Sequence, residues 1–304
     1  MTTPNPHPNH NPNTDRTTNP HPNTGHTTST STSHSPHPGT GTGHTTGPTT
    51  GAATGTRTVS APRPDKPVAL VTGASGGLGT ALATELDRIG CRVALHYHHN
   101  HHDALQTSEH LTNDNLIVQA DITDHDSVTN LHHHITQELG EIDILINNAA
   151  IRKDALLIHQ PPETWTQIIQ TNLIGTYHMT HTVLPSMLKR RWGRIINIVS
   201  PSALIATPGQ TAYATSKAAI IGLTRTLATE TGRRGVTINA LSPGFMETRM
   251  TATATQKFRH NLTTNLPIPR LTTPQETAPA IHIFLDNDYI TGQTLNIDGG
   301  ITLT

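Results

Sequence analysis

Short apolar runs alternate with helical patterns along most of the chain, and this alternation restricts the folds open to it. The apolar runs predict strands at residues 68–72, 92–97, 116–120, 142–147, 194–200, 236–241 and 294–297. Apolar spacings of three to four predict a helix at residues 78–89, a polar helix is expected at 103–112, and further helices are expected at residues 124–138, 162–188, 211–231 and 274–285. Because the strands are continuously apolar, helices should cover both faces of a parallel sheet. We therefore predict an α/β fold with a doubly wound parallel sheet of about seven strands.

The first 60 residues differ in composition from the rest of the chain. They hold only four apolar and three charged residues. Such a segment buries too little apolar surface to offset the entropy of ordering it. We predict a disordered tail over residues 1–64 and a single folded domain over residues 65–304. Seven histidines in this tail leave weak metal binding or partner docking as alternatives to a solvated tail.

Charge and hydropathy exclude several classes of protein. The net charge is −1 and the pI is about 7.1, so neither nucleic acid nor an anionic membrane is an expected partner. No apolar run reaches the length of about 18 residues that a transmembrane helix needs, and the N-terminus lacks the apolar core of a secretory signal. The single cysteine, Cys91, excludes a disulfide framework. We therefore expect a cytoplasmic protein.

A glycine cluster, TGASGGLG at residues 72–79, joins the first predicted strand to the first predicted helix. Gly73, Gly77 and Gly79 lack a Cβ atom, so the backbone can turn tightly and approach a pyrophosphate. The helix that follows offers free N–H groups and the positive end of its dipole. The cluster predicts nucleotide binding at the carboxyl end of the first strand.

Four polar residues are candidates for catalysis. Tyr213 and Lys217 are four apart on a predicted helix, so they share a face. A nearby ammonium group favours the phenolate, which suits acid–base work near neutral pH. Ser200 ends the fifth predicted strand, and Asn172 lies in an otherwise apolar helical stretch. Taken singly, each has a structural alternative, such as an exposed Tyr–Lys pair or a capping asparagine.

Together these segments resemble the short-chain dehydrogenase/reductase family, which has a Rossmann fold. The resemblance spans nearly all of residues 66–300 and rests on TGASGGLG (72–79), Asp121 in QADITD, NNAA (147–150), Asn172, Ser200, Tyr213 with Lys217, and SPGFMET (242–248). Within the family, NNAAIRKDALL and YITGQTLNIDGG resemble the 3-oxoacyl-[acyl-carrier-protein] reductases.

The resemblance implies roles for the four catalytic candidates. Tyr213 would protonate the substrate oxygen during reduction. Lys217 would lower the tyrosine pKa and hold the nicotinamide ribose. Ser200 would polarise the carbonyl, and Asn172 would hold a water molecule of a proton relay. The cofactor would supply the hydride.

The resemblance also implies cofactor contacts. Asp121 would bind the adenine, Asn148 and its neighbours the adenosine ribose, and Met246 and Thr248 the nicotinamide. The full expected set is Gly73, Ser75, Gly76, Gly77, Leu78, Gly79, His98, His99, Asp121, Ile122, Asn148, Ala149, Ala150, Tyr213, Lys217, Pro243, Gly244, Met246 and Thr248.

The end of the second predicted strand favours NADPH over NADH. NAD-preferring relatives usually place an acid there to accept from the ribose 2′-OH, but this position is Tyr97 and the next acid is Asp103. His98 and His99 could donate to a 2′-phosphate and carry charge near it. Against this, Gly76 stands where many NADP enzymes have an arginine.

These two histidines belong to HYHHNHH at residues 96–102, which has five histidines in seven positions. A metal site needs ligands in fixed geometry, commonly with a carboxylate or thiolate. The stretch offers no cysteine and one nearby acid, Asp103. We therefore expect no functional metal here.

Arg191 and Arg234 match positions where carrier-protein reductases of this group present basic residues to an acidic carrier; solvated turn residues are the alternative. The group implies a homotetramer or dimer. Two departures stand out, since Ala150 replaces the glycine of the family's NNAG and the stretch between Leu285 and Thr291 is short. That end often packs against a partner subunit, which weakens the expectation of a tetramer.

The main prediction is NADPH-dependent reduction of a 3-oxoacyl thioester on an acyl carrier protein, in fatty-acid or polyketide synthesis. One alternative is a dehydrogenase of a free alcohol, ketone, sugar or steroid. Another is a non-catalytic dinucleotide-binding protein, which the four filled catalytic positions disfavour. The polar segment 249–270 does not indicate an acyl chain.

Overall fold

The computed structural model describes residues 61–246, 264 and 266–303, and in them seven parallel strands form one sheet of order β3-β2-β1-β4-β5-β6-β7. The strands are β1 (Val68–Val71), β2 (Arg92–Tyr97), β3 (Asn115–Gln119), β4 (Ile142–Asn147), β5 (Gly193–Ile198), β6 (Val236–Pro243) and β7 (Thr294–Ile297). The predicted doubly wound parallel sheet is confirmed.

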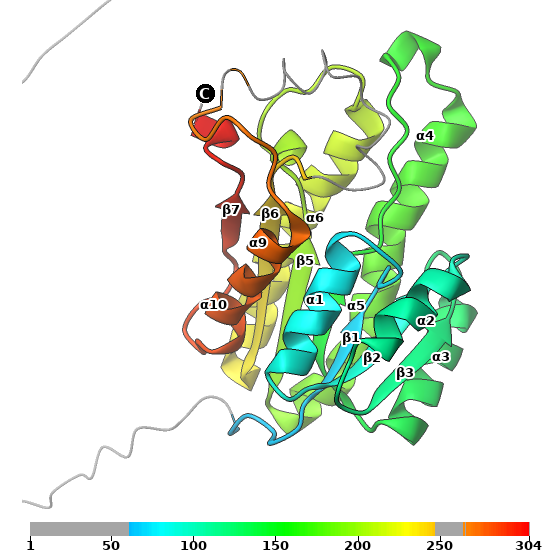
Figure 1. The fold of residues 1–304 in the computed structure, drawn as a ribbon, viewed down its shortest axis with the longest axis vertical. Helices are drawn as coiled ribbons and strands as arrows, with labels where there is room; N and C mark the ends of the chain where they lie inside the picture. The colour runs from blue at the N-terminus through cyan, green and yellow to red at the C-terminus, as the bar shows by residue number, and fades with distance from the viewer. Residues whose placement is uncertain (1–60, 247–263, 265, 304) are drawn as a thin grey trace, which may run out of the picture. The chain divides into compact units, whose positions relative to one another are not determined.

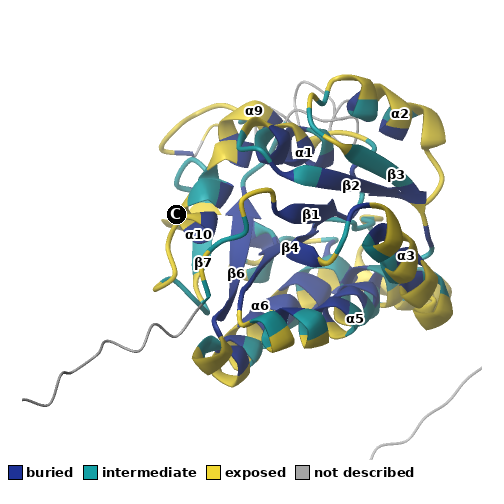
Figure 2. Ribbon diagram, turned by 90° about the horizontal axis from the view of Figure 1, so that it is seen from below, coloured by how far each residue is buried: buried dark blue, intermediate teal, exposed yellow. Residues whose placement is uncertain are grey.

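Helices lie on both faces of this sheet (Figure 1, Figure 2). One face carries α1 (Leu78–Arg88), α2 (His101–Glu109), α9 (Pro274–Thr277) and α10 (His282–Leu285). The other carries α3 (His125–Glu138), α5 (Gly175–Arg190) and α6 (Thr211–Thr231), and α4 (Pro162–Ile169) leads into α5.

Packing on both faces explains why the strands are continuously apolar. In β1, Ala69 and Val71 join the core cluster that includes α1 and α10, whereas Val68 and Leu70 join the cluster that includes α3 and α5. Successive side chains of a strand point to opposite faces, so a strand buried on both sides is mainly apolar, and its few buried polar side chains, such as Asn147 and Asn197, are hydrogen-bonded.

The strand order reverses between β1 and β4. Val71 of β1 pairs with Leu95 of β2 on one side and with Ile146 of β4 on the other. The chain leaves β3 at one edge and returns to the middle of the sheet as β4. In doubly wound sheets this switch point opens a crevice at the carboxyl ends of the strands, where ligands bind.

Two helical stretches differ from the prediction. The helix expected over 162–188 contains a π-helical segment, Gln170–Ile174, between α4 and α5. The helix expected over 274–285 is divided by a 3₁₀ turn, Ala278–Ile281. Proline has no N–H to donate, and Pro279 lies in this turn. Single π-helical turns inside α-helices are frequent at functional sites.

The described residues begin at Ala61, within the segment predicted as a tail. Its N–H donates to the carbonyl oxygen of Arg191 at 3.0 Å, and Arg63 pairs with Asp286 at 2.9 Å. Residues 61–64 therefore contact the domain, while the rest of the predicted tail lies outside the described residues. Across the described ranges, no helix is long and apolar enough to cross a membrane.

Candidate active site

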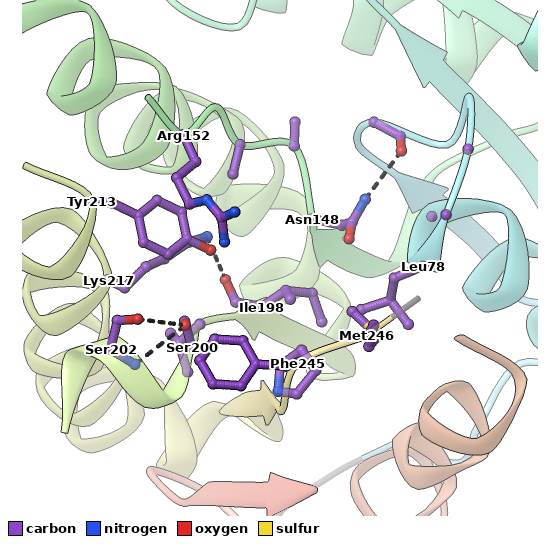
Figure 3. A pocket seen from close by; sticks show the side chains of 18 of the residues that line it. Leu78, Asn148, Arg152, Ile198, Ser200, Ser202, Tyr213, Lys217, Phe245 and Met246 are labelled. Carbon is purple, nitrogen blue, oxygen red and sulfur yellow. Dashed lines mark hydrogen bonds between the residues drawn. The ribbon is translucent and has the colours of Figure 1, made fainter. Parts of the chain in front are cut away.

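A cavity of about 410 Å³ lies at the carboxyl ends of β1, β4, β5 and β6 (Figure 3). It brings together most of the residues predicted for the site. Those that line it are Gly73, Ser75, Gly76, Gly77, Leu78, Gly79, Asn148, Ala149, Ala150, Ser200, Tyr213, Lys217, Pro243, Gly244 and Met246. Thr248 lies outside the described residues.

The glycine loop is shaped by backbone that other residues rarely adopt. Gly73 and Gly77 have φ angles of 65° and 53°, in the left-handed region. At Gly79 a Cβ atom would stand 2.1 Å from the carbonyl oxygen of Gly73, so the loop folds against the first turn of α1. At Gly76 a Cβ atom would meet nothing within 4 Å, which leaves open space over the loop.

Asn148 ties the glycine loop to the end of β4. Its Nδ2 donates to the carbonyl oxygens of Thr72 and Gly73, both at 3.0 Å. The hydroxyl of Thr72 accepts from the N–H groups of Asn148 and Ala149 at 2.9 and 3.0 Å. These hydrogen bonds therefore fasten the glycine loop, which follows β1, to the segment that follows β4.

His96 makes a second attachment, which sequence reasoning missed. Its Nδ1 accepts from the N–H of Gly73 at 3.1 Å, and its Nε2 lies 3.1 Å from the carbonyl oxygen of Ala120. The side chain is 2% exposed, and burial lowers its pKa to about 4. The available signal was its place in β2, on the face that meets the glycine loop.

Four predicted cofactor residues do not line the cavity: His98, His99, Asp121 and Ile122. His98 and His99 are exposed, and Nε2 of His98 lies 3.9 Å from a carboxylate oxygen of Asp121. The Asp121 carboxylate accepts from the N–H and hydroxyl of Thr123 at 2.9 and 2.8 Å.

Two residues at the start of α2, Asn100 and Asp103, line the cavity instead of these histidines. Sequence reasoning noticed Asp103 only as the first acid after β2. The structure places it on the cavity wall.

Tyr213, Lys217 and Ser200 share one wall of the cavity (Figure 3). Tyr213 and Lys217 come from α6, and Ser200 lies two residues beyond β5. The Nζ of Lys217 donates to the carbonyl oxygen of Ile198 at 2.7 Å and lies 5.8 Å from the centre of the Tyr213 ring. The Ser200 hydroxyl accepts from the N–H of Ser202 at 3.3 Å.

Burial governs the electrostatics of this wall. It raises the pKa of Tyr213, while the charge of Arg152 and the hydrogen bond with Ser200 act in the opposite direction. Burial also lowers the pKa of Lys217 to about 8. Arg152 was not predicted, although it lies two residues after NNAA in the loop that follows β4 and lines the cavity.

Asn172 lies behind the wall, in the π-helical segment, and is fully buried. Its Oδ1 accepts from the N–H of Ile151 at 2.8 Å, and its Nδ2 donates to the carbonyl oxygen of Ile151 at 3.0 Å. Nδ2 also donates to the Ser216 hydroxyl at 3.1 Å. The asparagine therefore fastens the loop that carries Arg152 to α6.

Arg191 and Arg234 lie at the other end of the sheet, because they precede β5 and β6 while the cavity lies beyond these strands. Arg191 donates to the carbonyl oxygen of Arg233 at 3.1 Å, and Arg234 to that of Leu188 at 3.2 Å. In the part of the chain that the structure describes, no group of three or more His, Cys, Asp or Glu side chains is arranged to hold a metal.

Known proteins resemble this chain over the whole site. Residues 67–258 match the sequence model of the family described as short chain dehydrogenase. The 3-oxoacyl-[acyl-carrier-protein] reductase FabG of Haemophilus influenzae is 38% identical over 239 residues, which cover 78% of this chain and 98% of the relative. Nodulation protein G of Azospirillum brasilense is 38% identical over 239 residues (77% and 97%), and FabG of Vibrio harveyi 41% over 237 residues (77% and 96%). The chain therefore belongs to the short-chain dehydrogenase family.

Proposed function

We propose that the protein reduces 3-oxoacyl thioesters, carried on an acyl carrier protein, to 3-hydroxyacyl thioesters with NADPH. One observation carries the proposal: Ser200, Tyr213 and Lys217 line the same cavity as the glycine loop. Relatives named as 3-oxoacyl-[acyl-carrier-protein] reductases match this chain at 38–41% identity over nearly their full length, which supports the substrate class. Fatty-acid synthesis is the proposed setting, and polyketide synthesis is the alternative.

The loop and the start of α1 suit a dinucleotide. The open space at Gly76 leaves room above the backbone, and the first turn of α1 has no side-chain cap on its N–H groups. Gly73 and Gly77 would let a pyrophosphate approach, and Met246 and Pro243 border the other end of the cavity. When bound, a reduced nicotinamide supplies the hydride.

The polar wall supplies the proton. The Ser200 hydroxyl is placed to donate to the substrate ketone, and the Tyr213 hydroxyl to protonate its oxygen. Burial raises the pKa of Tyr213, so the phenol is protonated at neutral pH, while Arg152 and Ser200, rather than the expected Lys217, act to lower this pKa. Lys217, held by the carbonyl oxygen of Ile198, places a positive charge beside the phenol. In this proposal Asn172 has two roles. It fastens the loop that carries Arg152, and it holds the water molecule of the proton relay that the family resemblance implies.

NADPH is proposed over NADH because the residue that ends β2 is Tyr97, which brings no carboxylate to the ribose 2′ position. Asp103 on the cavity wall acts in the opposite direction. His98 and His99 remain proposed contacts to a 2′-phosphate, and they would have to turn towards the cavity to make them. Comparing kcat/KM for the two cofactors tests the preference.

The carrier protein is proposed as the donor of the acyl chain. A carrier docked on Arg191 and Arg234 would sit at the end of the sheet opposite this chain's own cavity. It would therefore serve the cavity of a neighbouring subunit in the expected homotetramer or dimer. Light scattering of the purified protein tests the oligomer, and Arg191→Glu with Arg234→Glu tests the docking.

The experiment that tests the function is NADPH oxidation with an acetoacetyl thioester against a panel of free ketones. We expect turnover with the thioester. Turnover confined to the free ketones would favour the alternative, a dehydrogenase of free alcohols and ketones, and would overturn the proposed substrate class.

A further inference from the structure

Arg152 faces the cavity from the wall that carries the candidate catalytic residues. It lies five residues after the end of β4, and its side chain is 21% exposed. Figure 3 shows the guanidinium beside Tyr213, on the side of the cavity where Ser200 lies. Burial raises the pKa of Tyr213, and the charge of Arg152 is the largest influence in the opposite direction, as expected for a cation close to the phenol.

A chain of polar contacts holds Arg152 in this place. Its Nε lies 3.2 Å from a carboxylate oxygen of Asp154, whose other oxygen accepts from Nε2 of Gln210 at 3.1 Å. The buried Gln210 accepts in turn from the hydroxyl of Ser202 at 2.7 Å, and the N–H of Ser202 donates to Ser200. Arg152 and Ser200 are therefore the two ends of one network.

The network leaves most of the guanidinium free to bind a substrate. A guanidinium has five N–H donors in a planar fork, and the contact with Asp154 engages the Nε side. Asp154 is the single ion-pair partner that the described residues give to Arg152. The remaining donors belong to a group at the cavity wall.

We propose that Arg152 determines specificity by binding a second oxygen of the substrate, one methylene group away from the carbonyl that is reduced. This inference rests on the proposed function for the placement of the reduced carbonyl at Ser200 and Tyr213. In a 3-oxoacyl thioester the second oxygen is the thioester carbonyl, and in a free 3-oxoacid it is a carboxylate oxygen. Both accept hydrogen bonds, and a planar guanidinium suits either.

A simple ketone has no acceptor at this position. It would leave the guanidinium with unmatched donors inside a partly buried site, and such sites reject substrates that lack the expected polar group. Arg152 therefore separates 3-oxoacyl substrates from ketones of similar size, while Ser200 and Tyr213 treat the reduced carbonyl in the same way in both.

The test compares Arg152→Met and Arg152→Lys with the unaltered enzyme on three substrates: an acetoacetyl thioester, free acetoacetate and 2-pentanone. Lys153→Met is the matched control, because Lys153 is exposed, contacts Gln167 at 3.2 Å and does not line the cavity. We expect Arg152→Met to lower kcat/KM for the substrates with a second oxygen by roughly 10- to 100-fold, the range of a hydrogen bond to a charged group. The loss should lie mainly in KM and should exceed the loss for 2-pentanone, for which only the influence of the Arg152 charge on Tyr213 is removed. Arg152→Lys should be intermediate.

The arms of this test separate the two sources of the second oxygen. A greater loss with acetoacetate than with the thioester would identify a carboxylate, and the reverse a thioester carbonyl. For any substrate too slow for kinetics, its inhibition constant replaces kcat/KM in the same comparison. An equal loss on all three substrates would mean that Arg152 supports the site without contacting the second oxygen. No loss on any substrate would mean that Arg152 does not contact the substrate. Either result overturns the inference.

Failure of the proposed function would look different. An enzyme that reduces acetoacetate in an Arg152-dependent way but ignores the thioester would retain this inference and lose the proposed substrate. An enzyme that binds neither substrate with a second oxygen, and reduces only simple ketones, would lose both.

Discussion

The Nδ1 atom of His96 accepts a hydrogen bond from the N–H of Gly73, and its Nε2 lies 3.1 Å from the carbonyl oxygen of Ala120. A backbone N–H is a donor, so Nδ1 carries no proton, and the proton of the neutral ring sits on Nε2, facing the carbonyl. The ring therefore joins the glycine loop to the end of β3 only in its neutral form. If Nδ1 were protonated as well, its N–H would face the N–H of Gly73, and this hydrogen bond would be lost.

This relationship predicts a loss of stability in mild acid. The pKa of His96 is about 4 in the folded protein and near 6.5 when the chain is unfolded. As pH falls from 6.5 to 4, the unfolded chain takes up the proton first, so the free energy of unfolding decreases. The full contribution is roughly 3 kcal/mol. Urea denaturation at a series of pH values measures it.

Asparagine at this position offers a matched test. In His96→Asn the Oδ1 can still accept from Gly73, but no group titrates, so we expect the dependence between pH 6.5 and 4 to become shallower. His98→Asn is the control, since that side chain is 49% exposed. If His96→Asn and His98→Asn gave the same pH profile, His96 would not be a neutral acceptor in the folded protein.

Gly79→Ala should damage the cofactor site, whereas Gly222→Ala should not. A Cβ atom at Gly79 would stand 2.1 Å from the carbonyl oxygen of Gly73, so the loop or α1 must move, at about 1–3 kcal/mol of stability. At Gly222, in α6, a Cβ atom meets nothing within 4 Å, and alanine should add up to about 1 kcal/mol. Thermal unfolding with and without NADPH reports both effects. Equal NADPH stabilisation in the two variants would contradict the close contact.

Much of this fold follows from local pattern. Apolar runs predicted the central strands, because β1 and its neighbours are buried on both faces. The spacing of Tyr213 and Lys217 predicted a shared face of α6, and the glycine positions predicted the loop. In each case the physical cause acts within a few residues of the sequence.

The remaining features depend on contacts between distant segments. The bond from Gly73 to His96 joins residues 23 apart, and the contact of Asp154 with Gln210 joins residues 56 apart. The π-helical segment at Asn172 has no local signal, because its asparagine is held by Ile151 from another loop. Pattern analysis cannot pair such residues before the sheet order is known.

The region after β2 leads to a prediction about cofactor choice. Asp103 lines the cavity, and we expect its carboxylate to repel a ribose 2′-phosphate. Asp103→Asn removes the charge with little change in shape, and we expect the ratio of kcat/KM for NADPH to that for NADH to rise by a few-fold, equivalent to about 1 kcal/mol. The ratio is measured in reduction assays with each cofactor.

The paired double variant His98→Ala with His99→Ala tests the opposite effect. If the two histidines contact the 2′-phosphate, this variant lowers the ratio of kcat/KM for NADPH to that for NADH. An unchanged ratio would remove them from the cofactor site, in agreement with their position outside the cavity wall. A fall in the ratio with Asp103→Asn would mean that Asp103 does not face the 2′ position.

Tyr213→Phe tests the proton donor of the proposed mechanism. The substitution removes the hydroxyl and keeps the ring, so kcat should fall by roughly 10²- to 10⁴-fold, while NADPH binding, followed by fluorescence, should not change. Tyr177→Phe is the control, because Tyr177 is a tyrosine of α5 that is 46% exposed and does not line the cavity. If Tyr213→Phe retained full activity, the Tyr213 hydroxyl would not be the proton donor, and the proposed mechanism would be wrong.

We expect Lys217 to set the upper pH limit of the proposed reaction. Its pKa is about 8, below the ordinary 10.5, because the ammonium is buried against Ile198 and Tyr213. Below pH 8 the Nζ carries the charge that the proposed mechanism uses beside Tyr213; above pH 8 this charge is lost, so we expect reduction to slow as pH rises through 8. Lys217→Met should be slow at every pH and should not show this fall in rate near pH 8. Bound cofactor phosphates favour the ammonium and would move the fall in rate to a higher pH. If Lys217→Met still showed a fall in rate near pH 8, that fall would come from another group. The charge of Lys217 would then not control the proton transfer from Tyr213.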